Sequence, residues 1–464
     1  MTSSGQVPPA TVSPPVSPPG SPRLPPRAPA RPYVQVAGLT AAMTLIALGN
    51  GLMATFVPIR LDAAGADARA VGAVVTIYAA GMLLGCLLSG RLVRRSGHVR
   101  TFTALAAVGT VSALLLAVAV DTVLWGALRA VGGFCTTGMF MAAQSWLNAA
   151  TASAWRGRVM ALFYVCFTVG LAGGALLAGR VGIEDDGAYM LLAGLYAAAV
   201  APISLTRLEQ PPPPERIAVR VAEVYRISPV GLVGAFVSGG LGMTMMGVGP
   251  IYGAAIGLEP AAIALLIAAL QGGNLVIQWP LGALSDRIDR RVVILAAGAG
   301  VAAISVLAAG LAPRVAGGTG ALFWLTLALF AIWGGLAESL YTVSTAHAND
   351  HTEPDALVTV SSTILIAWAT GATVGPALAT LALEGLGPLG MWGLFIVEAA
   401  LFALFVLWRR TRRAEPAEAD QESFQAWPAA APPIPEWSPY APDEAVPTDE
   451  KPGAPPPDRQ AGGR

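Results

Sequence analysis

Three ionisable side chains of this sequence lie inside long apolar stretches, and two of them are candidates for a direct role in function. Arg129 and Glu338 each have apolar and small residues on both sides. A charged group inside a membrane is costly, so such residues usually bind a ligand, exchange ions or pair with a neighbour. For Glu338 we expect proton exchange or the binding of a cationic ligand, because a low-dielectric site favours the neutral carboxyl group. A purely structural role for either residue is the alternative.

Uncharged polar residues recur inside the same kind of stretch. On a helix, Gln144 would share a face with Arg129, and Thr342 would lie one turn beyond Glu338. The residues that we expect to form a cavity for a solute or a proton are Asn50, Arg129, Gln144, Gln271, Asn274, Glu338 and Thr342. Amide side chains in a membrane often bond neighbouring helices instead, and that alternative stays open. Glu398, in the last apolar stretch, is expected to have a packing role.

Methionines and histidines are the remaining candidates for binding. Met243, Met245 and Met246 could adapt to an amphipathic ligand, although core packing explains them equally well. His347 and His351 are four residues apart and would share a helix face, but they stand at the edge of an apolar stretch beside a proline. We therefore expect no metal site and no cofactor.

Two arginine-rich segments stand at matching positions in the two halves of the chain. They read Gly90-Arg91-Leu92-Val93-Arg94-Arg95 and Gly282-Ala283-Leu284-Ser285-Asp286-Arg287-Ile288-Asp289-Arg290. Each interrupts a long apolar region, so the chain is expected to contain an internal repeat. Repeated halves in a membrane protein indicate a transporter with its binding site between them. The alternative is that these charges only set the topology.

Composition places the chain in a membrane. Hydrophobic residues make up 55% of the 464 and charged residues only 12%, with a mean hydropathy of +0.62. A soluble domain is about 25% charged, so most of this surface must meet lipid. Outside an acidic C-terminal tail the connecting segments are rich in arginine, which suits contact with anionic lipid head groups. No basic platform with interleaved aromatic residues is present, so nucleic acid is not an expected partner.

Apolar stretches long enough to cross a ~30 Å hydrocarbon core recur along the chain. Backbone groups in lipid must be satisfied within the segment, so each stretch is predicted to be a helix. The twelve predicted spans are 36–58, 70–92, 100–120, 123–147, 158–180, 188–206, 229–253, 261–283, 292–312, 321–345, 358–383 and 388–408. The sequence thus predicts an all-α integral membrane protein of two pseudo-symmetric six-helix bundles.

Proline-rich segments divide the chain. Residues 1–32 and 409–464 are predicted to be disordered tails, because they hold too little apolar surface to fold. The six-helix bundles are predicted at 33–206 and 229–408. Residues 207–228 form a linker with four consecutive prolines, followed by an amphipathic stretch that includes Val221, Val224 and Arg226. That stretch is predicted to lie on the membrane as an interfacial helix.

Arginines also set the predicted orientation. The connections on one side carry Arg91, Arg94, Arg95, Arg100, Arg156, Arg158, Arg207, Arg216, Arg220, Arg226, Arg287, Arg290, Arg291, Arg409, Arg410, Arg412 and Arg413. The connections on the other side carry only Arg60, Arg69, Arg180 and Arg314. The richer side is expected to be cytoplasmic, which places both termini inside. The loop 346–357 on that side is discordant, since it holds Asp350 and other acidic residues but no arginine or lysine.

Several segments together resemble the major facilitator superfamily, and more specifically its YcaD-like branch. The resemblance covers residues 33–408 and rests on six spans plus six, a basic central loop, and Gly-x-x-x-Asp-Arg-x-x-Arg-Arg from Gly282. Further matching segments are Gly81-Met82-Leu83-Leu84-Gly85-Cys86, Gln144-Ser145-Trp146-Leu147-Asn148, Arg156-Gly157-Arg158, Gln278-Trp279-Pro280-Leu281-Gly282 and His347-Ala348-Asn349-Asp350. In the first half, Arg94 stands where the family usually has an aspartate.

The resemblance implies a secondary transporter of a small solute that works by alternating access, with proton coupling as an open question. By likeness to the family, a gating role falls on Gly90, Arg94, Arg95, Gly282, Asp286, Arg287 and Arg290, and a hinge on Gly371, Gly375 and Pro376. The expected partners are the solute, membrane lipid and protons, the expected location is the plasma membrane, and the expected state is a monomer. The alternative is a non-transporting sensor or scaffold with the same fold. An enzyme is not expected, because the sequence contains no evident cluster of catalytic residues.

Overall fold

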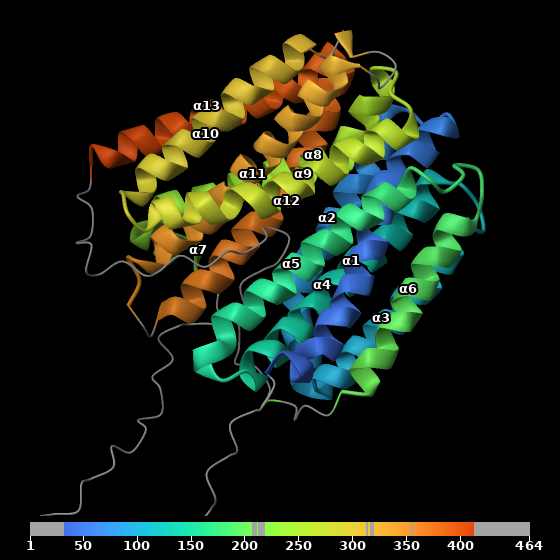
Figure 1. The fold of residues 1–464 in the computed structure, drawn as a ribbon, viewed down its shortest axis with the longest axis horizontal. Coiled ribbons are helices and arrows are strands. Elements are labelled where there is room, and N and C mark those ends of the chain that lie inside the picture. The colour runs from blue at the N-terminus through green and yellow to red at the C-terminus, as the bar shows by residue number, and fades with distance from the viewer. Residues whose placement is uncertain are drawn as a thin grey trace, which may run out of the picture.

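The computed structural model describes residues 32–206, 211, 219–311, 314–315, 320–353 and 356–412. Both predicted tails lie almost wholly outside these ranges, as does most of the linker before residue 219. Within them the chain forms helices throughout (Figure 1). Their bounds are α1 Pro32–Ala63, α2 Ala68–Ser96, α3 His98–Leu115, α4 Thr122–Ala150, α5 Ser153–Ala178, α6 Gly187–Ser204, α7 Val221–Ile227, α8 Pro229–Ala255, α9 Pro260–Ser285, α10 Arg290–Leu311, α11 Ala321–Asn349, α12 Leu357–Leu386 and α13 Pro388–Arg410.

Each predicted span overlaps one long helix, and α7 is the short exception between the two halves. Eleven of the long helices in the described part are long and apolar enough to cross a membrane. The twelfth, α4, carries more polar side chains, among them Arg129, Gln144 and Asn148, all of which are buried. Neighbouring helices therefore shield the polar face of α4 from lipid.

The long helices form two bundles with equivalent internal packing (Figure 1). In the first bundle α1 packs on α5 and α6, α2 on α4, and α3 on α4 and α6. In the second, α8 packs on α12, α9 on α11, and α10 on α11 and α13. The predicted fold class, two pseudo-symmetric six-helix bundles, is confirmed.

The bundles meet mainly through two helix pairs, α2 with α12 and α5 with α9. Contact is closest at one end, where Gly72 of α2 adjoins Thr380 of α12 and Gly179 adjoins Ala264 of α9. The Arg69 guanidinium also pairs there with the Glu384 carboxylate at 2.5 Å. We call this the closed end. The bundles diverge from it toward the left of Figure 1.

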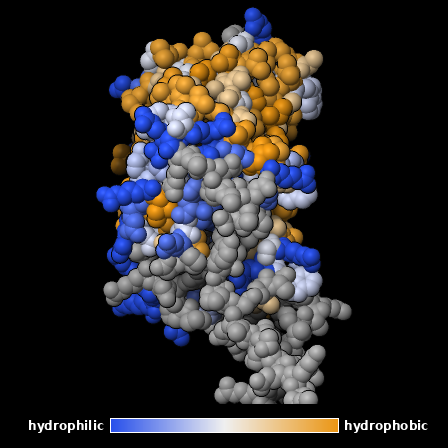
Figure 2. Space-filling model, turned by 90° about the vertical axis from the view of Figure 1, so that its left-hand side faces the viewer, coloured by the Kyte–Doolittle hydropathy of each residue, from blue (hydrophilic) through white to orange (hydrophobic). Residues whose placement is uncertain are grey.

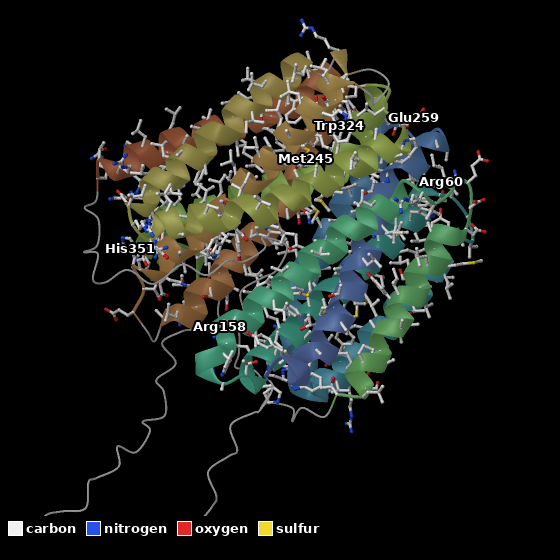
Figure 3. The ribbon with its side chains drawn as sticks, viewed as in Figure 1. Arg60, Arg158, Met245, Glu259, Trp324 and His351 are labelled. Carbon is white, nitrogen blue, oxygen red and sulfur yellow. The ribbon has the colours of Figure 1, made fainter. Side chains whose placement is uncertain are left out.

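The opposite end, which holds the α2–α3 and α9–α10 turns, is called here the turn end. Figure 3 places Arg158 and His351 at the turn end, and Arg60 and Glu259 at the closed end. Hydrophilic residues gather on the turn end, and hydrophobic surface lies along its upper margin (Figure 2). Its described residues include most of the arginines of the predicted arginine-rich side.

The short helix α7 lies against the second bundle. Its seven residues turn Val224 inward, where that side chain is fully buried, and leave Tyr225 and Arg226 exposed. The backbone N–H of Arg220 donates to Thr363 Oγ1 of α12 at 3.0 Å. The helix is thus amphipathic and contacts both α8 and α12. Its predicted place on the membrane surface stays a prediction.

Candidate functional site

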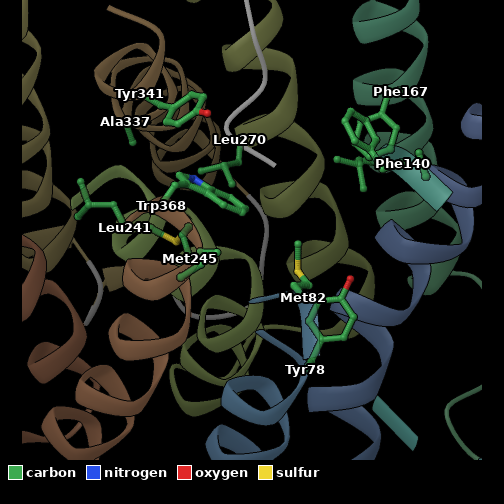
Figure 4. Packing of buried hydrophobic residues seen from close by; sticks show 14 of the residues in the cluster. Tyr78, Met82, Phe140, Phe167, Leu241, Met245, Leu270, Ala337, Tyr341 and Trp368 are labelled. Carbon is green, nitrogen blue, oxygen red and sulfur yellow. The ribbon is translucent and has the colours of Figure 1, made fainter. Parts of the chain in front are cut away.

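A cavity lies between the two bundles, near the middle of the long helices. Its volume is about 80 Å³. The side chains that line it include Asn50, Tyr78, Met82 and Thr136 from the first bundle and Met243, Met246, Gln271, Glu338 and Trp368 from the second. Figure 4 shows Trp368 beside Leu270 and Met245, with Met82 and Tyr78 of α2 on the facing side. The wall is mostly apolar and carries a few polar groups, which is typical of a small-molecule site.

Asn50 is held in this wall by hydrogen bonds from two other helices. Thr136 of α4 donates to Asn50 Oδ1 at 3.2 Å, and Tyr196 of α6 donates to the same oxygen at 3.1 Å. The two hydroxyl groups are themselves 2.9 Å apart. Asn50 is thereby fixed in one orientation. Thr136 and Tyr196 were not predicted as cavity residues, because hydroxyl groups are common in membrane helices and give no signal by themselves.

Arg129 lies beside the central cavity. Its guanidinium carbon is 3.9 Å from the centroid of the Tyr78 ring, and the residue is only 8% exposed. Such a cation–π contact stabilises a buried arginine, more strongly when it is desolvated. Arg129 lines a small neighbouring space together with Val75 and Met246. Tyr78 lines both spaces and separates the guanidinium from the larger one.

Glu338 lines the central cavity directly. It projects from α11 toward Gly242 of α8 and Gln271 of α9, which line the same space. A Cβ on Gly242 would lie 3.7 Å from Glu338 Oε1, an ordinary contact distance, so the Glu338 carboxyl group reaches α8. Thr342, one turn further along α11, is buried and donates to the Ser339 carbonyl at 3.2 Å.

The remaining carboxyl group of the apolar stretches, Glu398, lies elsewhere. It projects from α13 toward α8, where a Cβ on Gly240 would come within 2.7 Å of Glu398 Oε1. It does not line the central cavity. The two glutamates therefore occupy different environments within the second bundle.

The other predicted amides lie outside the central cavity. Gln144 of α4 donates from Nε2 to the Tyr164 hydroxyl of α5. Asn274 and Gln278 line a second cavity, between α5 and α9, with a volume of about 280 Å³. The predicted polar stripe of α9 is thus divided, with Gln271 in the central cavity and the other two amides in this lateral one.

The predicted gate of the second half contains a buried ion pair. Arg290 Nε donates to Asp350 Oδ2 at 2.6 Å, and the two side chains are 1% and 2% exposed. Arg290 also pairs with Asp286 at 3.5 Å, across the turn that joins α9 to α10. Arg287 is exposed, and Gly282 is buried beside Ser285. Asp350 was not predicted as a gate residue, although it lies in the discordant loop of the arginine-rich side.

The first half has a neutral contact at the matching position. His98 corresponds to Arg290 as the first residue of its helix, and its Nε2 lies 3.1 Å from Ser145 Oγ of α4. Both side chains are buried. Gly90 is buried, Arg95 is exposed and Arg94 is half-buried. The two turns are therefore structurally equivalent but chemically different.

The predicted hinge lies in α12, which stays helical through Pro376. Gly371 packs against the Phe236 backbone of α8, and Gly375 against that of Gly240. These glycines allow α8 and α12 to approach closely. The structure thus gives them a packing role, and the hinge stays a prediction.

The two closely spaced histidines contact each other. The rings of His347 and His351 are 4.5 Å apart, and His351 Nδ1 lies 2.8 Å from the His347 carbonyl. Across the described ranges, no three His, Cys, Asp or Glu side chains gather in a group that could hold a metal ion.

Comparisons with known proteins agree with this geometry. The family model of the Major Facilitator Superfamily matches residues 39–233 and 230–442. The relative named "Uncharacterized MFS-type transporter YcaD" from Salmonella arizonae is 25% identical over 352 residues, covering 75% of this chain and 88% of that relative. The same protein from Salmonella enteritidis PT4 is 26% identical over the same length.

Solved structures show the same fold. A mutant form of the nucleoside transporter NupG superposes with a TM-score of 0.67 at 12% identity, covering 81% of this chain and 100% of that one. A bacterial homologue of the human lysosomal transporter Spinster, in an inward-facing and unoccupied conformation, superposes with a TM-score of 0.65 at 13% identity. That match covers 84% of this chain and 100% of that one. The chain belongs to the Major Facilitator Superfamily and is a multi-pass secondary transporter of a small solute.

Proposed function

We propose that the central cavity binds the transported solute and that the two bundles rock about it, so that the cavity opens to each side of the membrane in turn. The observation that carries this proposal is that both bundles contribute polar groups to one cavity, Asn50 from α1 and Gln271 and Glu338 from the second bundle. Binding between repeated halves is the arrangement that alternating access requires.

The direction of opening follows from the contacts between the bundles. Gly72 with Thr380 and Arg69 with Glu384 hold the closed end together. We assign the turn end to the cytoplasm of a plasma-membrane protein, because its described connections hold most of the arginines. Asp350, in the discordant loop, is neutralised by its ion pair with Arg290. The state described here is therefore the inward-facing one. We take the transporter to act as a monomer.

Glu338 is the proposed coupling group. It is the carboxyl group that reaches the solute cavity, whereas Glu398 lies against α8 outside it. A proton on Glu338 changes the charge that a bound solute meets, which links solute binding to proton movement. Arg129 is assigned a positioning role, since it holds the Tyr78 ring that forms part of the cavity wall.

A thermal-shift screen of the purified protein tests this proposal. Sugars, amino acids, organic acids and amphipathic amines are added at two pH values, and a ligand at 100 times its dissociation constant should stabilise by about 2.7 kcal/mol. We expect the stabilisation to depend on pH in the wild type and in the matched control Glu398→Gln, but not in Glu338→Gln. Asn50→Leu should weaken it at both pH values. A ligand that stabilises all four proteins equally, with the same pH dependence, contradicts the assignment of the cavity.

A further inference from the structure

The lateral cavity between α5 and α9 differs from the central one in facing lipid. Val165, Val276 and Trp279 form its rim and are 47%, 71% and 71% exposed. These apolar residues lie within helices long and apolar enough to cross a membrane, so we assign their exposed surface to contact with acyl chains. The cavity is therefore a groove open to the bilayer. Its volume of about 280 Å³ is close to the lower end of the range for small-molecule sites, about 300 Å³.

The floor of this groove is polar. Asn274, Gln278 and Thr168 line it and are 3%, 7% and 2% exposed. Asn274 Oδ1 is buried without a hydrogen-bond partner among the described residues. A buried amide oxygen without a partner costs roughly 1–3 kcal/mol, so a donor that reaches it from the groove would be favoured. An apolar rim over a hydrogen-bonding floor matches a molecule with an apolar body and a polar head.

The groove leads to the central cavity along both helices. On α9, Asn274 of the groove is three residues from Gln271 of the central cavity. On α5, Thr168 of the groove is three residues from Leu171 of the central cavity. One helical turn rises about 5.4 Å, so the two spaces are neighbours. The central wall also contains Met243 and Met246, whose flexible side chains fit varied apolar shapes.

The position of the groove explains why it is open. At the closed end α5 and α9 are in contact, where Gly179 adjoins Ala264. The groove residues lie between the closed-end contact and the turn end, at 161–168 of α5 and 274–279 of α9, where the bundles have diverged (Figure 1). Closing the turn end would bring α5 and α9 together and shut the groove.

From these observations we infer that the solute is a single-chain amphiphile with a hydrogen-bond-donating head, and that it passes between the bilayer and the central cavity through the α5–α9 groove. This inference rests on the proposed function and adds the class of solute and its route. Asn274 Oδ1 accepts from the head, and the apolar body lies along Val276 and Trp279 during the passage.

Quenching of tryptophan fluorescence by a brominated amphiphile tests the inference. The full chain is placed in lipid nanodiscs and titrated with bromododecanol, and the signal of Trp279 is isolated by subtracting that of Trp279→Phe. We expect saturable quenching of Trp279. Asn274→Leu should weaken the apparent affinity about threefold to tenfold, the effect of one lost hydrogen bond. Bromododecanoate, which has the same chain but no donor at neutral pH, should bind more weakly than bromododecanol.

A matched pair of variants separates the groove from ordinary contact with lipid. Ala161 lines the groove and Ala107 of α3 lies outside it, and both are exposed. We expect Ala161→Phe to abolish the saturable component and Ala107→Phe to leave it unchanged. Quenching that rises linearly with concentration, or that is equal in both variants, shows annular lipid contact only and overturns the inference.

The two proposals fail in different ways. If a water-soluble ligand stabilises the protein in a Glu338-dependent manner while the groove shows no saturable quenching, the route through the groove is wrong and the central site stands. If the groove binds bromododecanol but Glu338→Gln and Asn50→Leu leave every ligand-induced stabilisation unchanged, the central site is wrong.

Discussion

Removal of the Asp350 carboxylate should destabilise the protein strongly, because it leaves a buried arginine without its main partner. Two hydrogen bonds join Arg290 to Asp350, from Nε at 2.6 Å and from Nη2 at 3.3 Å, and both side chains are almost fully buried. Breaking a buried pair by removing one partner costs about 3–5 kcal/mol. Asp286 remains 3.5 Å from Arg290 and is 32% exposed, so it compensates in part. We therefore expect Asp350→Asn to lower the free energy of unfolding by about 3 kcal/mol.

Chemical unfolding in detergent micelles measures this difference. The control is Glu223→Ala, which removes the Arg220 partner from an exposed pair and should cost at most about 1 kcal/mol. The double variant Arg290→Met, Asp350→Leu replaces the pair by apolar side chains and should recover most of the loss. If Asp350→Asn costs no more than Glu223→Ala, the pair does not stabilise the α9–α10 turn and our reasoning about this gate is wrong.

Two further predictions concern packing and the first gate. Gly371→Ala should cost about 1–3 kcal/mol, because the new Cβ would meet the Phe236 backbone. Gly385→Ala in the same helix has open space and should be nearly neutral. Thermal unfolding of both variants checks this, and equal stability of the two would contradict it. Ser145→Ala should cost about 1 kcal/mol, since buried His98 loses its hydrogen bond. Ser344→Ala in α11 removes a buried hydroxyl with no hydrogen-bond partner in the described ranges and should cost less. The reverse order in chemical unfolding would contradict the stabilising role of the His98–Ser145 contact.

The long helices could be predicted because lipid imposes both length and composition. The predicted spans fall short mainly at helix ends: α1 continues to Ala63 and α11 to Asn349, through polar residues that hydropathy alone excludes. At the membrane edge, water and neighbouring helices satisfy such residues, so the helix does not end where the apolar stretch ends. The division into tails, linker and bundles at the predicted residues stays a prediction.

The candidate site could be predicted only in part. Asn50, Gln271 and Glu338 were expected in one cavity and line it together, since each is polar in the middle of its span. Helical spacing also placed Arg129 and Gln144 on one face, but it cannot say which neighbour each side chain meets. Those neighbours come from other helices: Tyr78 for Arg129, and Tyr164 for Gln144. Contacts between segments distant in sequence leave no periodic signal.

The sequence contained an indication that Asp350 is paired with a basic residue. Asp350 lies in a loop that lacks arginine and lysine on the arginine-rich side, which is unusual if the loop meets anionic lipid. A buried partner explains the exception, because Arg290 neutralises Asp350 inside the protein. In this chain the departure from the charge rule coincides with a buried ion pair.

The most direct test of the rocking mechanism measures two distances between spin labels placed at or next to the ends of α5 and α9. One pair replaces Arg158 and Arg287 at the turn end, and the other replaces Arg180 and Glu259 at the closed end; all four residues are exposed. Glu384→Gln removes the ion pair with Arg69 and serves as the perturbation, with Glu223→Gln as its control. Because an exposed pair contributes up to about 1 kcal/mol, the populations should shift by roughly twofold to fivefold.

Alternating access predicts opposite changes at the two ends. In Glu384→Gln, the closed-end distance should gain a longer population while the turn-end distance gains a shorter one, and Glu223→Gln should leave both distributions as in the wild type. Distances that change in the same direction at both ends, or a closed end that opens while the turn end stays unchanged, would contradict the rocking of two rigid bundles about the central cavity.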